Sequence, residues 1–347
     1  EAWVNADTPT VSIVATPAAG YVFCGWTGDT DDFTSDQYRS PSITVVGRVR
    51  TLRAEFRVEG TNVHTVPGDF SSIAAALASP LVKDGDTIQL ADGTHAFAQE
   101  ATVDGYTYLA KIDRFVTVRG SSPDDAVLDC GGFGGLYIDH PAALVEGVTI
   151  QNFQRTSSTF ALDFQRGVVS NACVSGRSGK CMKVEGSIPA IRSFEGAVFE
   201  DCVITNVNKQ NWDSSGIVFA QGTTFRRTTF YGNASYNYIV RVAALNGVRT
   251  RVEGCTFAKN SDYYRPMIFG SNVDVVDCVF YGNSSSDAGA GLSLSGVCTF
   301  DRCVVTNNTL NGSCPLVLCN ASSKVYATNC LFAANKIANW GAFKLDG

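Results

Sequence analysis

The stretch Val252-Glu-Gly-Cys-Thr-Phe-Ala-Lys-Asn260 contains a short motif that recurs through the second half of the chain. The motif is Cys, any residue, an apolar residue, two further residues and Asn, and Thr replaces the Cys in one copy. The copies, some of them fainter, begin at Val148, Cys173, Cys202, Thr228, Cys255, Cys278, Cys303 and Cys330. Gaps of 23 to 29 residues between these positions predict a solenoid of stacked units.

The local pattern of each unit indicates which solenoid this is. Short alternating runs of Val, Ile and Phe are separated by Gly, Asn and Ser, and no unit has a helical apolar stripe. The sequence therefore predicts an all-β fold, a right-handed parallel β-helix of roughly ten coils estimated from its period. Each coil would have about three short strands and stack at about 4.8 Å on the next.

The repeated Cys and Asn positions predict two internal columns. The cysteines would point inward as free thiols, because Cys is a small and well-buried residue, and disulfides between coils are the less expected alternative. Each Asn would mark a turn by adopting the left-handed conformation and bonding its own backbone. The expected cysteine column consists of Cys173, Cys202, Cys255, Cys278, Cys303 and Cys330.

Composition limits the class of protein. The chain has 347 residues, of which 45% are hydrophobic and 17% charged, and its net charge is −6. We expect no nucleic-acid partner, because a basic footprint is missing, and no membrane span, because no apolar run approaches the necessary length. The 12 Cys and three His do not have zinc spacing. We expect a monomer without a cofactor, and a fragment of a longer protein whose last coil is incomplete.

Residues 1–58 differ from the rest and predict a small all-β module. Strand-like runs flank an acidic loop, Thr27–Ser40, for which we prefer a solvated loop to a Ca²⁺ site. The segments ATPAAGYVFCGWTGD and LRAEF resemble the divergent B-repeats of bacterial internalin-type surface proteins. This resemblance implies a spacer or attachment unit on a secreted or cell-surface protein, and we expect that protein to be bacterial.

Residues 62–347 form the expected β-helix domain. Ser71–Leu77 reads as a short helix with a Ser or Asp cap, which would cover the open end of the stack. The segments VPGDFSSIAAAL, DGDTIQLADGTH and VTVRGSSPDDAVLD resemble the N-terminal part of the pectin-lyase-like superfamily. The resemblance implies the fold and not an activity, because this fold hosts many functions.

Candidate site residues come from aligning the strand that follows each Asn turn. Aligning Ala161–Arg166 with Cys181–Gly186 places Asp163 and Lys183 on the outer face, and Arg241 faces outward further along. The loops entering these strands contain aromatic residues, which suit contact with the apolar face of a sugar ring. These residues are Trp212, Tyr236, Tyr263, Tyr264 and Trp340.

Two functions follow from these residues. A polysaccharide lyase acting by β-elimination on an acidic polysaccharide would use Lys183 as base, Arg241 to neutralise the substrate carboxylate, and Asp163 to orient groups or bind Ca²⁺. We favour the other reading, a non-catalytic surface protein that contacts carbohydrate or serves as an adhesin or structural stalk. Its partner would be a polysaccharide or a glycan of the host or cell surface. Under it the same charges are simply solvated. The catalytic motifs of polygalacturonases and pectin methylesterases are missing from the sequence, and only residues 91–114 could form a wall beside a groove.

Overall fold

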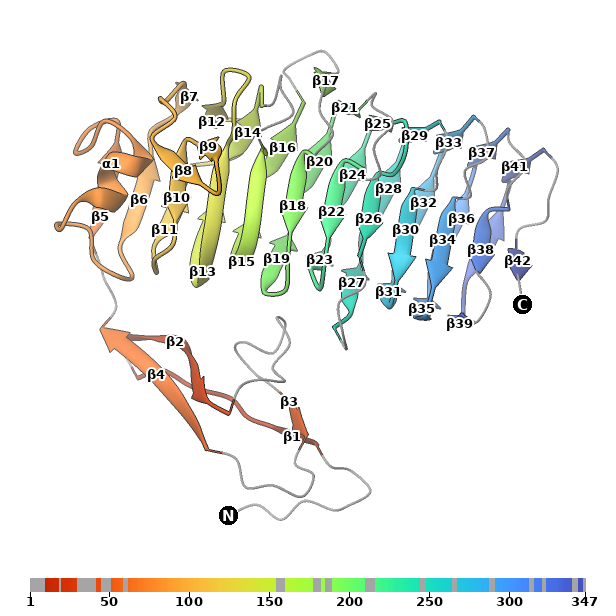
Figure 1. Ribbon diagram of the computed structural model, residues 1–347, viewed down its shortest axis with the longest axis horizontal. Helices are drawn as coiled ribbons and strands as arrows, with labels where there is room; N and C mark the ends of the chain where they lie inside the picture. Colours follow the sequence, from red (N-terminus) through yellow and green to blue (C-terminus); the bar gives the residue numbers. More distant parts are fainter. Residues whose placement is uncertain are drawn as a thin grey trace.

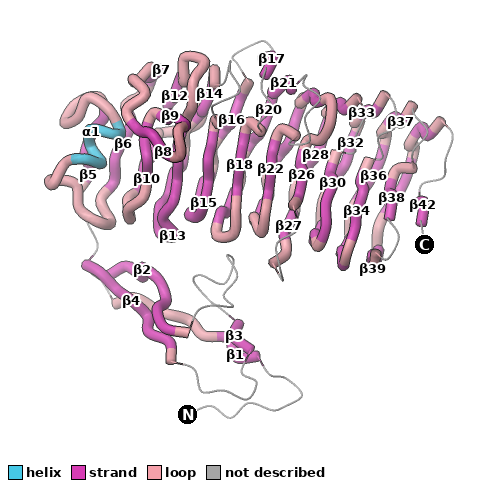
Figure 2. Tube along the Cα trace, viewed as in Figure 1, coloured by secondary structure: helices cyan, strands magenta, loops and turns pink. Residues whose placement is uncertain are grey.

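The computed structural model describes residues 10–18, 20–29, 42–44, 51–58, 62–153, 160–176, 182–184, 189–209, 216–243, 248–263, 267–286, 291–311, 315–319, 323–338 and 343–345. Within these residues the chain is a parallel β-solenoid of about nine turns with a single short helix, preceded by a small antiparallel module. Figures 1 and 2 show the stacked strands and the separate module. The predicted fold class is confirmed.

The described part of the N-terminal module consists of two antiparallel strand pairs. Strand β1 (Thr10–Ser12) pairs with β3 (Ser42–Thr44), and β2 (Tyr21–Gly28) pairs with β4 (Leu52–Val58). Phe23 packs edge-on against Trp26 and Phe56, with ring centroids 5.4 and 5.8 Å apart. These aromatic contacts give the module a small apolar centre. Most of the acidic loop lies outside the described residues.

Helix α1 (Ile73–Ala78) caps the first coil, as predicted. The Ser72 hydroxyl accepts a hydrogen bond from the Ala75 N–H at 3.0 Å and so satisfies one donor of the first turn. Ile73 is fully buried against the core. The guanidinium of Arg114 donates to the carbonyls of Leu77 and Val82, and so ties the end of the helix to the first coils.

Each regular coil contains four short strands rather than the expected three. In one coil these are β22 (Val218–Ala220), β23 (Thr224–Arg226), β24 (Thr229–Tyr231) and β25 (Ala234–Ser235). Every strand pairs in parallel with its counterpart in the next coil, so four rows of strands run along the solenoid. We number the rows 1 to 4 in that order.

Each row is a stack of parallel strands from successive coils, and the described strands of each row are as follows. Row 1 is β10 (Ala110–Ile112), the first part of β13 (Leu136–Glu146), the first part of β15 (Leu162–Ser170), β18 (Ile191–Ser193), β22, β26 (Val240–Val242), β30 (Ile268–Ser271), β34 (Leu292–Ser295), β38 (Val317–Cys319) and β42 (Phe343–Leu345). Row 2 is β5 (Val63–Val66), β6 (Thr87–Leu90), β11 (Thr117–Arg119), the second parts of β13 and β15, β19 (Ala197–Glu200), β23, β27 (Thr250–Glu253), β31 (Val273–Val276), β35 (Val297–Asp301) and β39 (Lys324–Thr328).

Rows 3 and 4 form separate sheets of ten and seven described strands. Row 3 is β7 (Gly93–His95), β12 (Ala126–Asp129), β14 (Thr149–Gln151), β16 (Cys173–Ser175), β20 (Val203–Thr205), β24, β28 (Thr256–Ala258), β32 (Val279–Tyr281), β36 (Val304–Thr306) and β40 (Leu331–Ala333). Row 4 is β17 (Met182–Val184), β21 (Val207–Lys209), β25, β29 (Ser261–Asp262), β33 (Ser284–Ser285), β37 (Thr309–Leu310) and β41 (Lys336–Ile337).

Stacked aromatic rings fill much of the core. The rings of Phe230 and Phe257 lie 4.4 Å apart and nearly parallel, and Phe257 stacks on Phe280 at 4.8 Å. All three side chains are at most 1% exposed. Because equivalent residues repeat at the strand spacing, identical side chains can stack from coil to coil without leaving cavities.

The cysteine column is confirmed with one exception. Cys202, Cys255, Cys278, Cys303 and Cys330 each come directly before a row 3 strand in matching register, and Thr228 takes the same place. Cys173 instead pairs with Val203, one residue out of this column, and is partly exposed. The prediction that Cys173 belongs to the column was therefore wrong.

Thiols in the column are free and hydrogen-bonded. Cys278 donates to the carbonyl of Val252 in the preceding coil at 3.2 Å, and the Thr228 hydroxyl makes the equivalent contact to Phe199 at 3.5 Å. A small side chain that can donate therefore suits this place. Burial raises the pKa of the Cys202 thiol to about 12. The described cysteines with described side chains are all unbridged, and for the column free thiols were the expectation.

The asparagine column also exists, but its asparagines do not act as predicted. The left-handed residue is the one before each Asn, for example Lys259 and Gly282 with φ of 56° and 61°. The Asn itself turns inward. Asn260, Asn283 and Asn308 are at most 1% exposed, and their amides bond each other and carbonyls of the preceding coil. Inward bonding wins because buried carbonyls at the corner need partners.

Candidate functional site

Row 1 presents an outward column of aromatic and charged side chains. Alternate residues of each strand face the core, and the residue between them faces out. Register places the outward residues in a single file. In order along the solenoid, they are Lys111, Tyr137, Asp163, Arg192, Phe219, Arg241 and Phe269. Asp163 and Arg241, predicted to face outward, both belong to this column.

The carboxylate of Asp163 is enclosed although it projects from the outer face. It accepts hydrogen bonds from the Tyr108 hydroxyl at 2.7 Å, the Gln165 amide at 2.8 Å, and two nitrogens of Arg192, of which Nε lies at 3.0 Å. The side chain is 0% exposed. These donors occupy both carboxylate oxygens, an arrangement that suits a buried ion pair and not a Ca²⁺ ligand.

Arg192 lies in an aromatic enclosure. Its guanidinium carbon is 4.4 Å from the ring centroid of Phe160, 5.7 Å from Tyr106 and 5.6 Å from Phe194. Desolvation alone would lower the pKa of Arg192, but the hydrogen bond and charge of Asp163 outweigh it and the pKa is raised. Burial, followed by the bond to Asp163, likewise raises the pKa of Tyr108. Arg192 and Tyr108 both keep their protons.

A hairpin supplies the cover of this cluster. Strands β8 (Ala101–Val103) and β9 (Tyr106–Tyr108) are antiparallel, and they present Tyr106 and Tyr108 to the Asp163–Arg192 pair. Residues 91–114 therefore do provide a wall beside row 1, as the sequence suggested.

Lys183 does not share the face of Asp163 and Arg241. Its strand β17 begins row 4 and pairs with β21, with Lys183 opposite Asn208. Arg192, not Lys183, occupies the position next to Asp163 in row 1. The predicted alignment of Cys181–Gly186 with Ala161–Arg166 was wrong, because Ile191–Ser193 alternates equally well and only the three-dimensional register distinguishes the two segments.

Arg241 lies three register steps from Asp163 in row 1. Its guanidinium carbon is 5.7 Å from the ring centroid of Phe219, and its side chain is partly exposed. The next outward residue, Phe269, stacks on Tyr238 with centroids 4.9 Å apart. Arg241 thus lies beside the ring of Phe219. The predicted catalytic roles of Lys183, Arg241 and Asp163 stay predictions.

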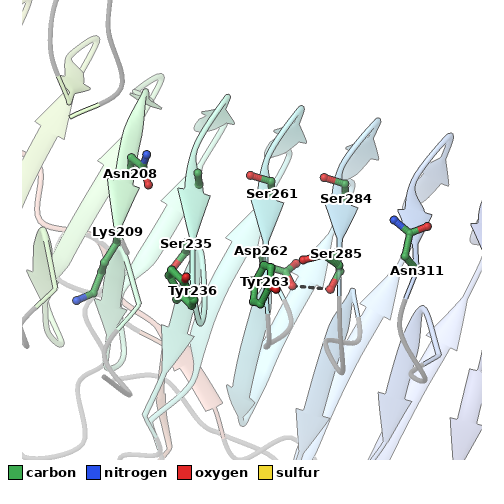
Figure 3. A pocket seen from close by; sticks show the side chains of 12 residues that line it. Asn208, Lys209, Ser235, Tyr236, Ser261, Asp262, Tyr263, Ser284, Ser285 and Asn311 are labelled. Atoms are coloured by element: carbon green, nitrogen blue, oxygen red, sulfur yellow. Dashed lines mark hydrogen bonds between the residues drawn. The ribbon is translucent and has the colours of Figure 1, made fainter. Parts of the chain in front are cut away.

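A groove of about 440 Å³ runs across the outer face of row 4. Tyr236 and Tyr263 follow neighbouring strands, and their rings are 5.3 Å apart at 49°. Figure 3 shows the groove with these rings beside the serines of the adjoining strands. The other outward residues that line it are small or carry hydroxyl or amide groups, namely Asn208, Ala234, Ser261, Ser284, Ser286 and Asn311.

Two charged side chains, Lys209 and Asp262, also border the groove but are buried, at 1% and 4% exposed. Asp262 accepts a hydrogen bond from the Ser285 hydroxyl at 2.6 Å, while its Oδ2 has no partner. Burial raises the pKa of the Asp262 carboxyl well above its usual value. The exposed lining is therefore aromatic and neutral. Of the other predicted sugar-contacting residues, Trp212, Tyr264 and Trp340 lie outside the described residues.

The sequence comparison decides the family. The model of the right-handed β-helix region matches residues 134–337, which is more than half of the chain. The chain belongs to the right-handed β-helix family. Residues 5–60 match the model of the divergent InlB B-repeat domain. No curated protein matches the chain significantly.

Comparison with solved structures found several chains that are similar to this one. They include the Agl-KA catalytic domain (12% identity, 89% of this chain and 71% of that chain, TM-score 0.31) and the A-module of the Azotobacter vinelandii mannuronan C-5 epimerase AlgE6 (12%, 79% and 93%, 0.31). The Streptococcus pneumoniae surface protein and adhesin PfbA is a third (10%, 74% and 91%, 0.36). At these identities the similarity concerns the fold alone.

Residues outside the sequence-based prediction contribute to the β-helix site. Arg192 and Tyr108 bond Asp163, and the ring of Phe160 lies against Arg192. These three residues come from three segments that carry no shared motif. Among the described residues, no group of three or more His, Cys, Asp or Glu side chains is arranged to hold a metal ion. None of the described helices is long and apolar enough to cross a membrane.

Proposed function

We propose that this β-helix is a secreted or cell-surface protein that binds a glycan without transforming it. Its match to the divergent B-repeat domain supports a bacterial origin. The observation that carries the proposal is the pair of adjacent, tilted rings of Tyr236 and Tyr263 in a groove that is also lined by neutral hydroxyl and amide groups. An aromatic plane packs on the apolar face of a sugar ring, and hydroxyl and amide groups bond its edge.

The state of Asp163 supports a non-catalytic role. Its carboxylate is bound by Tyr108, Gln165 and Arg192 and is shielded from solvent. A carboxylate that orients a substrate or binds Ca²⁺ must instead have an oxygen that the substrate or the ion can reach. The Asp163–Arg192 pair therefore serves to hold the hairpin of β8 and β9 on row 1.

Calorimetric titration with a panel of soluble oligosaccharides tests the proposal. The double variant Tyr236→Ala, Tyr263→Ala should bind the recognised oligosaccharide about tenfold or more weakly, the effect of losing about 1.4 kcal/mol or more. Tyr326→Ala is the matched control, because Tyr326 is 59% exposed on β39 in row 2. The groove is not the binding site if the double variant binds as tightly as the wild type.

A polysaccharide lyase is the second candidate, favoured by the outward position of Arg241 in row 1. Incubation with pectate, alginate and glycosaminoglycans, with and without Ca²⁺, would produce an ultraviolet-absorbing unsaturated uronate if the chain is a lyase. Lys183→Ala would then test the base. Constant absorbance with every polymer supports the binding function.

A further inference from the structure

The outer face of row 3 carries no charge over six consecutive strands. From β20 to β40, each strand contributes two outward residues on either side of a core residue. We call these twelve residues the neutral face. They are Val203, Thr205, Thr229, Tyr231, Thr256, Ala258, Val279, Tyr281, Val304, Thr306, Leu331 and Ala333.

Charged residues lie at both corners of the neutral face. At the corner before these strands, Arg227 bonds Asp201 at 2.7 Å, and Arg302 bonds Asp277 at 2.7 Å. At the opposite corner, the Lys259 ammonium lies 4.8 Å from the centre of the Tyr281 ring. In a chain that is 17% charged, an uncharged strip of this length favours an uncharged partner, because none of its twelve side chains carries a charge that contact would desolvate.

Two tyrosines stand in one file on this face. Register places Tyr231, Ala258 and Tyr281 on successive strands, so the tyrosines are two strand spacings apart, about 9–10 Å. The small side chain of Ala258 leaves room between them. Both tyrosines belong to the tetrapeptide Phe-Tyr-Gly-Asn, and they are 50% and 41% exposed. They therefore project from equivalent places at a fixed separation.

We propose that the neutral face binds the surface of an extended, uncharged β-1,4-linked polysaccharide of the cellulose or chitin class. Such a chain presents the same face of its sugar ring at every second residue, a repeat comparable with the separation of the two tyrosines. Aromatic rings pack on these apolar sugar faces. The face lies on row 3 and is separate from the row 4 groove, so the proposal does not depend on the groove binding glycans.

Sedimentation with insoluble polymer tests this proposal on the full chain. The protein is mixed with microcrystalline cellulose or crystalline chitin, and the unbound fraction is measured after centrifugation. The wild type should bind at least one of these polymers. The double variant Tyr231→Ala, Tyr281→Ala should bind about tenfold or more weakly, and Tyr326→Ala should bind as the wild type does. Since the substituted side chains are exposed, circular dichroism should show every variant folded.

Three results would overturn the proposal. The wild type could fail to bind both polymers, or the double variant could bind as well as the wild type. A wild-type dimer that the double variant dissociates, seen by light scattering, would make the face an interface between copies. The groove variant Tyr236→Ala, Tyr263→Ala should still bind the insoluble polymer, and this separates failure here from failure of the groove proposal.

Discussion

The Asp163 carboxylate receives hydrogen bonds from Tyr108, Gln165 and Arg192. Its charge is tolerated in a buried place because a guanidinium lies beside it and donors reach both oxygens. Asp163 thus shows that an acidic residue on the outer face of row 1 can have a purely structural role. A charged residue in such a position is evidence of catalysis only when its carboxylate can reach a substrate.

Replacing one partner of the Asp163–Arg192 pair should reduce the stability of the folded chain more than replacing both. Arg192→Gln should reduce the free energy of unfolding by about 3–5 kcal/mol, because it leaves the buried Asp163 charge without its cation. The double variant Asp163→Asn, Arg192→Gln should recover a large part of that loss. Urea unfolding of both variants measures the difference. Equal losses in the two variants would show that the charge of Asp163 is not the cause.

Asp262 should make stability depend on pH. Its pKa is raised in the folded chain by burial, so the folded state binds the proton more tightly than the unfolded state, whose pKa is about 3.9. The stabilisation is complete below that value and decreases as pH rises towards the folded pKa. The decrease is about 1.4 kcal/mol for each pH unit in this window.

The variant Asp262→Asn tests this pH dependence. It keeps an acceptor for the Ser285 hydroxyl but cannot ionise, so it should be more stable than the wild type at pH 7 and gain nothing near pH 3.5. Urea unfolding across this range, with Asp277→Asn on the surface as comparison, gives the slopes. Parallel pH profiles for the wild type and Asp262→Asn would refute the assignment.

At the scale of the element, the asparagine column links neighbouring coils at the corner between rows 3 and 4. Its side chains supply hydrogen bonds there that backbone pairing between the strands does not provide. The Asn283 amide donates to the Phe257 carbonyl at 2.8 Å and to Asn308 Oδ1 at 2.9 Å, and its own oxygen accepts from Asn260. Each residue is thus bonded to the coil on either side. Polar groups at this buried corner have partners only while the column is continuous.

Replacing an asparagine in the middle of the column should therefore reduce the stability of the folded chain more than replacing one at its end. Asn283→Ala leaves buried groups of two neighbouring coils without partners, each costing about 1–3 kcal/mol. Asn335→Ala serves as the matched control, because Asn335 is only partly buried in the last described coil. Thermal unfolding should show a clearly lower Tm for Asn283→Ala. A larger loss for Asn335→Ala would contradict this role of the column.

At the scale of the whole molecule, each coil contacts only the coils next to it, so stability is a sum over neighbouring coils. The stacked rings of Phe230, Phe257 and Phe280 are one such link. The cap formed by α1 is many coils away from them (Figure 1). Removing one of the central rings should therefore destabilise the neighbouring coils first.

Phe257→Ala should destabilise the central coils by about 3–5 kcal/mol and increase hydrogen exchange there. Amides of β24, β28 and β32 should lose protection before those of β6 and β11. Phe332→Ala, in the last described coil and only partly buried, is the control and should affect β40 alone. Uniform loss of protection along the solenoid would show global cooperativity instead.

Much of the fold could be predicted from the repeated motif and the local sequence patterns. The period, the alternation of Phe257 and its equivalents, and the Ser72 cap predicted the solenoid, its core and its capping helix, because each of these depends on neighbours in sequence. The same local reasoning identified Asp163 and Arg241 as outward strand residues, and Tyr236 and Tyr263 as aromatic residues of the loops between strands.

Only the tertiary structure decided which residues stand beside each other. Register placed Arg192 instead of Lys183 next to Asp163 and moved Cys173 out of its column. A shift of one or a few residues leaves the alternation of a strand unchanged but changes every cross-strand neighbour. The sequence by itself therefore determined which coils form and which side chains face out. Packing between coils, which joins residues about 25 positions apart, determined the composition of the site.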